Sequence, residues 1–175
     1  MLIVKAIKFA SEKHKGQVRR GSGLPYVTHP IIVMELVRKY KGDSKNLTSL
    51  LCAALLHDVL EDTECTYLEI EREFGPLTAS LVMELTSDKV QIKAIGKNKY
   101  LMKKMECMSQ YAFTLKLLDR LSNILDEPGE GYCRKTINLM AHLRVERKER
   151  TTRQTKIMQD IEDACINFLK EYNVQ

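Results

Sequence analysis

The sequence has no tryptophan, and only 8 glycines and 4 prolines stand among its 175 residues. Sandwiches and barrels of short strands need frequent turns, which glycine and proline usually supply, so this composition disfavours them. It disfavours a flexible linker protein for the same reason. Charged residues of both signs make up 29% of the chain, which also disfavours intrinsic disorder. The core must therefore rest on aliphatic residues, methionine and alanine, and these favour helices.

Long apolar runs and cysteine pairs are missing as well. The longest apolar run, residues 50–56, is far shorter than the roughly 20 residues that cross a bilayer. The N-terminus, Met-Leu-Ile-Val-Lys, has neither a basic region nor a cleavage site, so no secretory signal is expected. Five cysteines without a C-x-x-C pair suit free thiols better than a disulfide framework or a zinc site. We expect a cytoplasmic protein that does not contact membranes.

The net charge of +5 is unevenly distributed along the chain. Residues 1–40 carry eight basic and two acidic side chains, residues 41–90 carry four and ten, and residues 91–175 carry sixteen and eleven. An acidic middle between basic flanks is consistent with carboxylates around a metal and cations that bind a polyanion. Solvated helix faces that differ in charge explain the same distribution.

Apolar residues recur at three- to four-residue spacing almost throughout, which predicts an all-α fold, a single helical bundle over residues 1–175. The expected helices cover residues 2–10, 30–41, 45–60, 67–74, 76–85, 109–125, 131–146 and 151–172. Thr66 and Glu69 have the spacing of a capping box, and Ser109 is a candidate N-cap. Residues 16–30 are expected to form a loop, and the lysine-rich residues 88–100 a loop or a frayed helix.

Ionisable residues interrupt the most apolar of these helices at its end. His57 and Asp58 are followed by Glu61 and Asp62. On a continuous helix, residues four apart project from one face, so the four side chains would lie together. Such a group is costly to desolvate unless a cation compensates, and a divalent metal with imidazole and carboxylate ligands would do so. The alternative is that the His-Asp dipeptide occurs by chance.

Asp119 and Asn123 form a second pair four residues apart, on another apolar helix. The alternative for this pair is an exposed Asp119–Arg120 ion pair with Asn123 at the helix end. His14 and His142 are most simply surface or packing residues.

The order of these pieces resembles the HD-domain metal-dependent phosphohydrolases, and more narrowly the (p)ppGpp hydrolase domain of RelA/SpoT homologues. Five blocks carry the resemblance: GQVRRGSGLPY at residues 16–26, Thr28-His29-Pro30, LLHDVLEDT at residues 55–63, Phe74-Gly75, and KLLDRLSN at residues 116–123. The resemblance extends from about residue 4 to the last helix. It leaves no room for a synthetase domain or a regulatory tail, which points to the small single-domain hydrolases of the family.

The resemblance implies a role for each matching residue. The proposed metal site binds one Mn²⁺ ion through His29, His57, Asp58 and Asp119, as the resemblance implies. It also implies that Glu61 and Asp62 orient and activate the attacking water. For the substrate, it implies that Asn123 contacts the ribose, that the arginines Arg19 and Arg20 lie near the base and phosphates, and that the lysines Lys93 and Lys97 contact phosphates. The expected reaction is hydrolysis of (p)ppGpp at the 3′-pyrophosphate, which releases pyrophosphate and GDP or GTP.

The sequence departs from the family pattern in two places. One additional residue between Arg20 and Gly23 leaves open which arginine meets the base and which the phosphates. Leu118 and Ser122 stand where the family usually has alanine and histidine. Because neither position is a metal ligand in the pattern, we expect altered packing or substrate preference rather than an inactive site.

Two other functions compete with this one. A related phosphohydrolase would act on another nucleotide, such as a dinucleotide 2′-phosphate or a nucleoside phosphate. A nucleic-acid-binding or regulatory module would use the basic run between Arg144 and Lys156. Because Glu146 and Glu149 interrupt that run and aromatics are missing from it, a solvated helical surface explains it better. The pattern carries no indication of oligomeric state.

Overall fold

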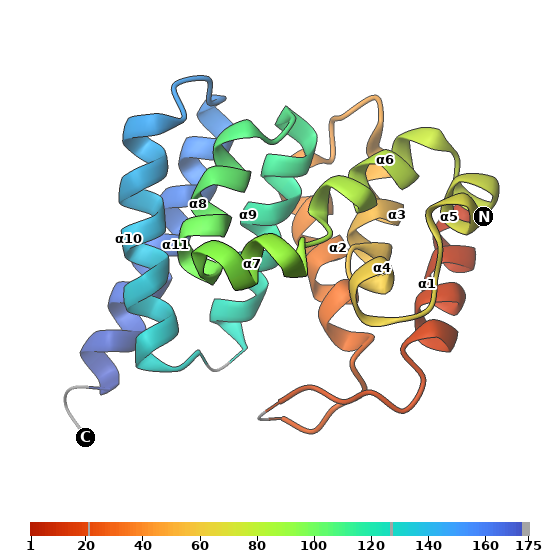
Figure 1. Cartoon of the computed structure of the whole chain (residues 1–175), viewed down its shortest axis with the longest axis horizontal. Coiled ribbons are helices and arrows are strands. Elements are labelled where there is room, and N and C mark those ends of the chain that lie inside the picture. Colours follow the sequence, from red (N-terminus) through yellow and green to blue (C-terminus); the bar gives the residue numbers. More distant parts are fainter. Residues whose placement is uncertain (21, 127, 173–175) are drawn as a thin grey trace. The chain divides into compact units, whose positions relative to one another are not determined.

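The computed structural model describes residues 1–20, 22–126 and 128–172, and it confirms an all-α fold (Figure 1). The helices are α1 (Leu2–Lys13), α2 (Thr28–Lys41), α3 (Leu47–Leu56), α4 (Val59–Asp62), α5 (Tyr67–Phe74), α6 (Pro76–Leu85), α7 (Lys89–Ile95), α8 (Lys97–Cys107), α9 (Gln110–Leu125), α10 (Glu130–Glu146) and α11 (Thr152–Tyr172). The chain forms two compact units, residues 1–87 and residues 88–175. One domain over residues 1–175 remains a prediction.

Helix α3 is the centre of the first unit. Residues 50–56 are each at most 1% exposed, and the helix packs against α1, α2 and α6. The longest apolar run of the sequence is therefore surrounded on all sides by other helices. Helix α2 begins two residues before the expected start at Pro30. Pro30 is tolerated there because the first four amides of a helix have no partner within it.

The expected helix over residues 45–60 is wrong at its C-terminal end. Helix α3 ends at Leu56, and a separate short helix, α4, begins at Val59. Nδ1 of His57 lies 2.8 Å from the carbonyl oxygen of Ala54. In an uninterrupted helix that oxygen would accept the amide of Asp58. The four ionisable side chains therefore do not share one face of a single helix.

The local signals around α5 and α6 are confirmed. Thr66 accepts from the amide of Glu69, and the Glu69 carboxylate accepts from the amide of Thr66, which completes the capping box. Gly75 has a φ of 85°, a conformation that favours glycine, and Pro76 opens α6. These residues turn the chain back so that α5 packs against α6.

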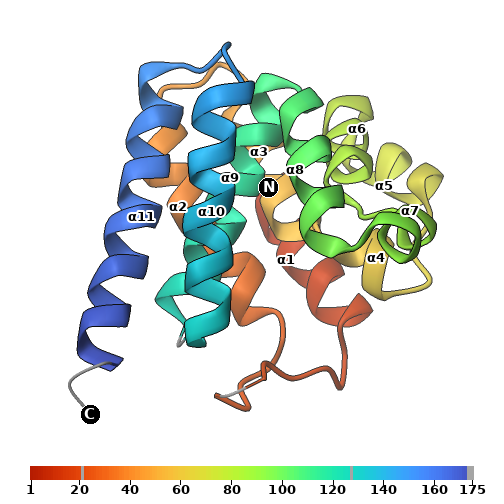
Figure 2. The same ribbon diagram turned by 60° about the vertical axis from the view of Figure 1, so that its left-hand side comes forward.

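The second unit consists of α7 to α11, in which α9 and α10 both pack against α11 (Figure 2). Ser109 caps α9 as expected, and α10 and α11 begin within one residue of their expected starts. Of the two alternatives for residues 88–100, a loop or a frayed helix, the loop is wrong, because residues 89–95 form α7 and α8 begins at Lys97. The Asp88 carboxylate accepts from the amides of Val90 and Gln91, which stabilises the start of α7.

The basic run near the C-terminus is only partly a solvated surface. Arg147 is 6% exposed, donates to the carbonyl oxygens of Met105, Glu106 and Met108, and lies 4.1 Å from the centroid of the Phe113 ring. Arg144 pairs with Glu162. These arginines connect α10 to its neighbours within the second unit, which accounts for part of the run without a nucleic acid.

All five cysteines are free, as the sequence predicts. Among the described residues, no helix combines the length and apolarity needed to span a bilayer.

Candidate metal centre

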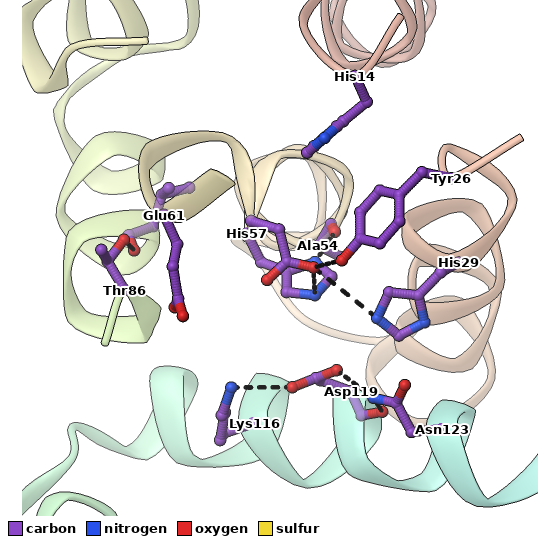
Figure 3. A network of polar contacts seen from close by, with 12 residues as sticks. His14, Tyr26, His29, Ala54, His57, Glu61, Thr86, Lys116, Asp119 and Asn123 are labelled. Atoms are coloured by element: carbon purple, nitrogen blue, oxygen red, sulfur yellow. Dashed lines mark hydrogen bonds and ion pairs between the residues drawn. The ribbon is translucent and has the colours of Figure 1, made fainter. Parts of the chain in front are cut away.

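Three of the four residues expected to bind a metal lie together in the first unit (Figure 3). His29 is in the first turn of α2, and His57 directly follows α3. Oδ2 of Asp58 lies 2.9 Å from Nε2 of His57 and 4.0 Å from Nε2 of His29. The centroids of the two imidazole rings are 5.2 Å apart, and both rings are buried. Two imidazoles and a carboxylate thus converge on one point.

The tautomer of His57 follows from its contact with Ala54. A carbonyl oxygen can only accept, so the ring nitrogen at 2.8 Å from it carries a proton. The neutral ring then presents a lone pair at Nε2, which faces the Asp58 carboxylate. Two electron-pair donors in contact require a cation between them or a second proton on the ring. Metal-bound histidines usually donate their other nitrogen to a carbonyl or carboxylate, so this donor set fits a metal ion.

Asp119, the fourth expected ligand, belongs to the second unit and is almost fully buried on α9. Its Oδ2 lies 2.9 Å from Nζ of Lys116, and its Oδ1 accepts from the amide of Asn123 at 2.8 Å (Figure 3). The alternative of an exposed Asp119–Arg120 pair is wrong. Arg120 donates instead to the hydroxyl of Thr136. The carboxylate of Asp119 is therefore held on both oxygens by neighbours on its own helix.

Glu61 and Asp62 are carried by α4 and differ in their surroundings. Oε2 of Glu61 accepts from the amide of Ser87 at 2.9 Å, and the residue is half-buried. Asp62 is exposed, and its carbonyl oxygen accepts from the side-chain amide of Gln17 at 3.1 Å. Of the two, Glu61 has its carboxylate fixed by the backbone of the same unit.

In the expected substrate loop, the described residues 17–20 and 22–26 form the two sides of a short hairpin arm between α1 and α2. The amide of Arg19 donates to the carbonyl of Leu24, and the amide of Tyr26 donates to that of Gln17. Val18 and Pro25 form an isolated antiparallel bridge. Arg19 is half-buried and Arg20 is exposed, while Gly21 of this block lies outside the described residues. The arm thus presents at least one arginine to solvent.

The remaining expected substrate contacts lie in the second unit. Lys93 on α7 and Lys97 at the start of α8 are exposed. Asn123 is half-buried, and its amide also donates to the main-chain carbonyl of Asp119. Leu118 and Ser122, the two departures from the family pattern, are each at most 1% exposed and belong to the core of this unit.

Sequence reasoning missed Tyr26 beside the centre, and for His14 it predicted only a surface or packing role. The hydroxyl of Tyr26 donates to Oδ2 of Asp58 at 2.5 Å. His14, assigned to the surface or to packing, is 3% exposed, and its ring lies against that of Tyr26. His142, in contrast, is half-buried and pairs with Glu106. Tyr26 stands inside a block that resembles the family, but no periodicity indicates a contact between residues 32 apart.

Comparison with known proteins gives a consistent result. A family model described as "HD domain" matches residues 6–125. Guanosine-3′,5′-bis(diphosphate) 3′-pyrophosphohydrolase MESH1 of Xenopus tropicalis is 40% identical over 126 residues, which are 71% of this chain and 69% of that protein. The human protein of the same name is 36% identical over 125 residues, 71% of this chain and 68% of its own length.

A bacterial relative and a solved structure complete the comparison. The guanosine-3′,5′-bis(diphosphate) 3′-pyrophosphohydrolase of Aquifex aeolicus is 37% identical over an alignment of 131 residues that covers 70% of this chain and 17% of that protein. A solved structure described as a metazoan ortholog of SpoT that hydrolyzes ppGpp has a TM-score of 0.75 and 24% identity. The match covers 99% of this chain and 97% of that one, and it shows a shared fold.

Proposed function

This chain belongs to the HD-domain family, and on that premise we propose that it is a metal-dependent hydrolase that removes pyrophosphate from the 3′ position of (p)ppGpp. The substrate follows from the curated relatives, several of which carry this activity in their names. The observation that carries the proposal is the convergence of the two buried imidazoles, His29 and His57, on one carboxylate oxygen of Asp58, a donor set that fits a metal ion.

The proposed metal ligands are His29, His57, Asp58 and Asp119. The first three converge within the first unit, and the resemblance to the family supplies Asp119. When bound, a divalent ion supplies Lewis acidity, which lowers the pKa of water and polarises a phosphoryl oxygen. We propose Mn²⁺ as the ion, because the resemblance to the family implies it and the carboxylates among the proposed ligands suit it.

Glu61 is the proposed base for the attacking water, with Asp62 beside it. The amide of Ser87 holds one carboxylate oxygen of Glu61, which limits the orientations that the side chain can adopt. A base that is already positioned takes up a proton without reorganisation in the transition state. Asp62 is exposed and contributes negative charge at the end of α4.

Basic side chains supply the countercharge that a guanosine polyphosphate needs. Arg19 and Arg20 are placed on the hairpin arm, and Lys93 and Lys97 are exposed in the second unit. Guanidinium groups bind phosphates through paired hydrogen bonds and also stack on bases. We assign the arginines to base and phosphates, the lysines to phosphates, and Asn123 to the ribose. Water attack on the 3′-pyrophosphate then yields pyrophosphate with GDP from ppGpp, or with GTP from pppGpp.

The test is product analysis with purified protein, Mn²⁺ and a panel of nucleotides. We expect one pyrophosphate and one GDP for each ppGpp consumed, as resolved by anion-exchange chromatography. The panel includes a dinucleotide 2′-phosphate and nucleoside monophosphates. Turnover of one of these, with ppGpp untouched, would contradict the proposed substrate while leaving the hydrolase class intact.

A further inference from the structure

The hydroxyl of Tyr26 donates a hydrogen bond to the Asp58 carboxylate oxygen on which the candidate metal ligands converge. Tyr26 Oη donates to Oδ2 of Asp58 at 2.5 Å, and that same oxygen lies near both imidazoles. The Tyr26 ring is also 6.1 Å from that of His29, between ring centroids. Tyr26 stands at the base of the hairpin arm, so a residue of the arm contacts the metal-binding segment directly (Figure 3).

The Tyr26 ring is itself held by His14, at the end of α1. The two ring centroids are 4.7 Å apart, with the ring planes at 43°. Figure 3 shows the His14 side chain extending from its helix toward Tyr26 and His57. Because His14 is only 3% exposed, its ring packs against the phenol ring of Tyr26 in the interior of the first unit.

Gln17 fixes the orientation of the His14 ring. Its side-chain nitrogen donates to the carbonyl oxygen of Asp62, which can only accept. The side-chain oxygen of Gln17 must then accept from Nδ1 of His14, 2.8 Å away. Nε2 of His14 is buried and has no hydrogen-bond partner among the residues that the structure describes. His14 is thus attached through Gln17 to the segment that carries Glu61 and Asp62.

We propose that Tyr26 is a positioning residue for the metal centre: its hydroxyl holds Oδ2 of Asp58 at the point where His29 and His57 converge, and His14 holds the phenol in place. The inference rests on the proposed function, because it requires that Asp58 bind a metal. A hydrogen-bond donor to one lone pair restricts the carboxylate and leaves its other lone pairs for the cation. Partners of this kind typically contribute a factor of roughly 10 to 100 in metal affinity.

The experiment measures Mn²⁺ binding to the full chain by isothermal titration calorimetry. Tyr26→Phe removes only the hydroxyl and keeps the ring that packs on His14. We expect the Kd for Mn²⁺ to rise by roughly 10- to 100-fold, with the melting temperature of the metal-free protein close to that of wild type. Tyr67→Phe is the matched control, because the Tyr67 hydroxyl also contacts a carboxylate, that of Glu71, 3.3 Å away on α5. We expect Tyr67→Phe to bind Mn²⁺ as wild type does.

A metal rescue separates positioning from a general structural role. We expect the hydrolysis rate of Tyr26→Phe to be low at limiting Mn²⁺ and to approach the wild-type rate when Mn²⁺ is saturating. Because His14 acts through Tyr26, His14→Ala should weaken Mn²⁺ binding in the wild type and add little in the Tyr26→Phe background. Additive losses in the double variant would contradict the role given to His14.

An unchanged Mn²⁺ affinity in Tyr26→Phe would overturn the inference. That outcome leaves the proposed function standing, because wild-type protein would still release pyrophosphate from ppGpp. Conversely, a wild-type protein that hydrolyses another nucleotide contradicts the proposed substrate, while the Mn²⁺ titrations still test Tyr26. A wild-type protein that binds no Mn²⁺ overturns both.

Discussion

Oδ2 of Asp58 lies 2.9 Å from Nε2 of His57, while the other ring nitrogen, Nδ1, faces the carbonyl oxygen of Ala54 at 2.8 Å. The contact places two electron-pair donors against each other at a buried point, which is unfavourable without a positive charge. A cation bound to both atoms attracts each of them, so the arrangement becomes favourable. The helix break at His57 creates the relationship, because it frees the Asp58 side chain from the face that a continuous helix would impose.

Replacing Asp58 with alanine should abolish Mn²⁺ binding and hydrolysis together, since the ion loses a carboxylate ligand. Calorimetry and a pyrophosphate-release assay measure the two effects. Asp163→Ala removes an exposed carboxylate from α11 and serves as the control, which should keep both properties. Wild-type hydrolysis in Asp58→Ala would show that this carboxylate is not a ligand.

Glu61→Gln should retain Mn²⁺ and lose roughly two to four orders of magnitude in kcat, the usual contribution of a positioned base. The glutamine oxygen can still accept from the amide of Ser87, so the side chain keeps its place. Glu64→Gln, at an exposed position three residues further on, is the control. If Glu61→Gln kept its full turnover, the base would have to be another residue.

Arg147→Met should destabilise the fold without changing the chemistry. The buried guanidinium donates to three backbone carbonyl oxygens. A hydrogen bond to a charged group contributes about 1.5–3 kcal/mol to the free energy of unfolding. A loss of about 3 kcal/mol lowers the melting temperature by roughly 6–12 °C in a chain of this size. Calorimetric melting measures the change, and exposed Lys148→Met is the control. A normal melting temperature with loss of RNA binding would instead favour the nucleic-acid-binding alternative.

Thiol labelling should single out Cys107, the one exposed cysteine. Burial raises the pKa of Cys52 and Cys65 to about 11 and that of Cys165 to about 12, and it also raises the pKa of Cys133. A raised pKa lowers the thiolate fraction, and the thiolate is the reactive form. Iodoacetamide at pH 8 should therefore add one adduct to the native protein and five to the unfolded protein, as measured by intact mass.

Cys107→Ser provides the control for this labelling, because the native variant should then remain unmodified. Rapid modification of the native protein at several thiols would contradict the burial of the other four.

The sequence was sufficient to predict the helices whose signals are local. The capping box of Thr66 and Glu69, Pro76 at the start of α6, and the Ser109 cap each involve residues within a few positions. The sequence does not decide between a loop and a frayed helix for the lysine-rich α7, because this helix buries no residue. Its start depends on the Asp88 carboxylate, and its end on Gly96 with a φ of 81°.

The same distinction between local and long-range contacts applies to the candidate site. His57 and Asp58 are adjacent in the chain, so the sequence places them in one segment, but the contact between their side chains depends on the helix break at His57. The contact of Tyr26 with Asp58 and that of Gln17 with Asp62 depend on how the hairpin arm folds back toward α4, which no local pattern specifies. The helix break was missed because residues 50–60 continue a helical apolar pattern, and a side-chain contact to Ala54 accompanies the interruption.

The most direct test of the central claim is to titrate metal-free protein with Mn²⁺ and to record bound metal and pyrophosphate release from ppGpp in the same samples. We predict that release rises in proportion to bound Mn²⁺ and reaches its maximum at one ion per chain. Full release from protein that holds no metal, or one bound ion without any release, would contradict the account.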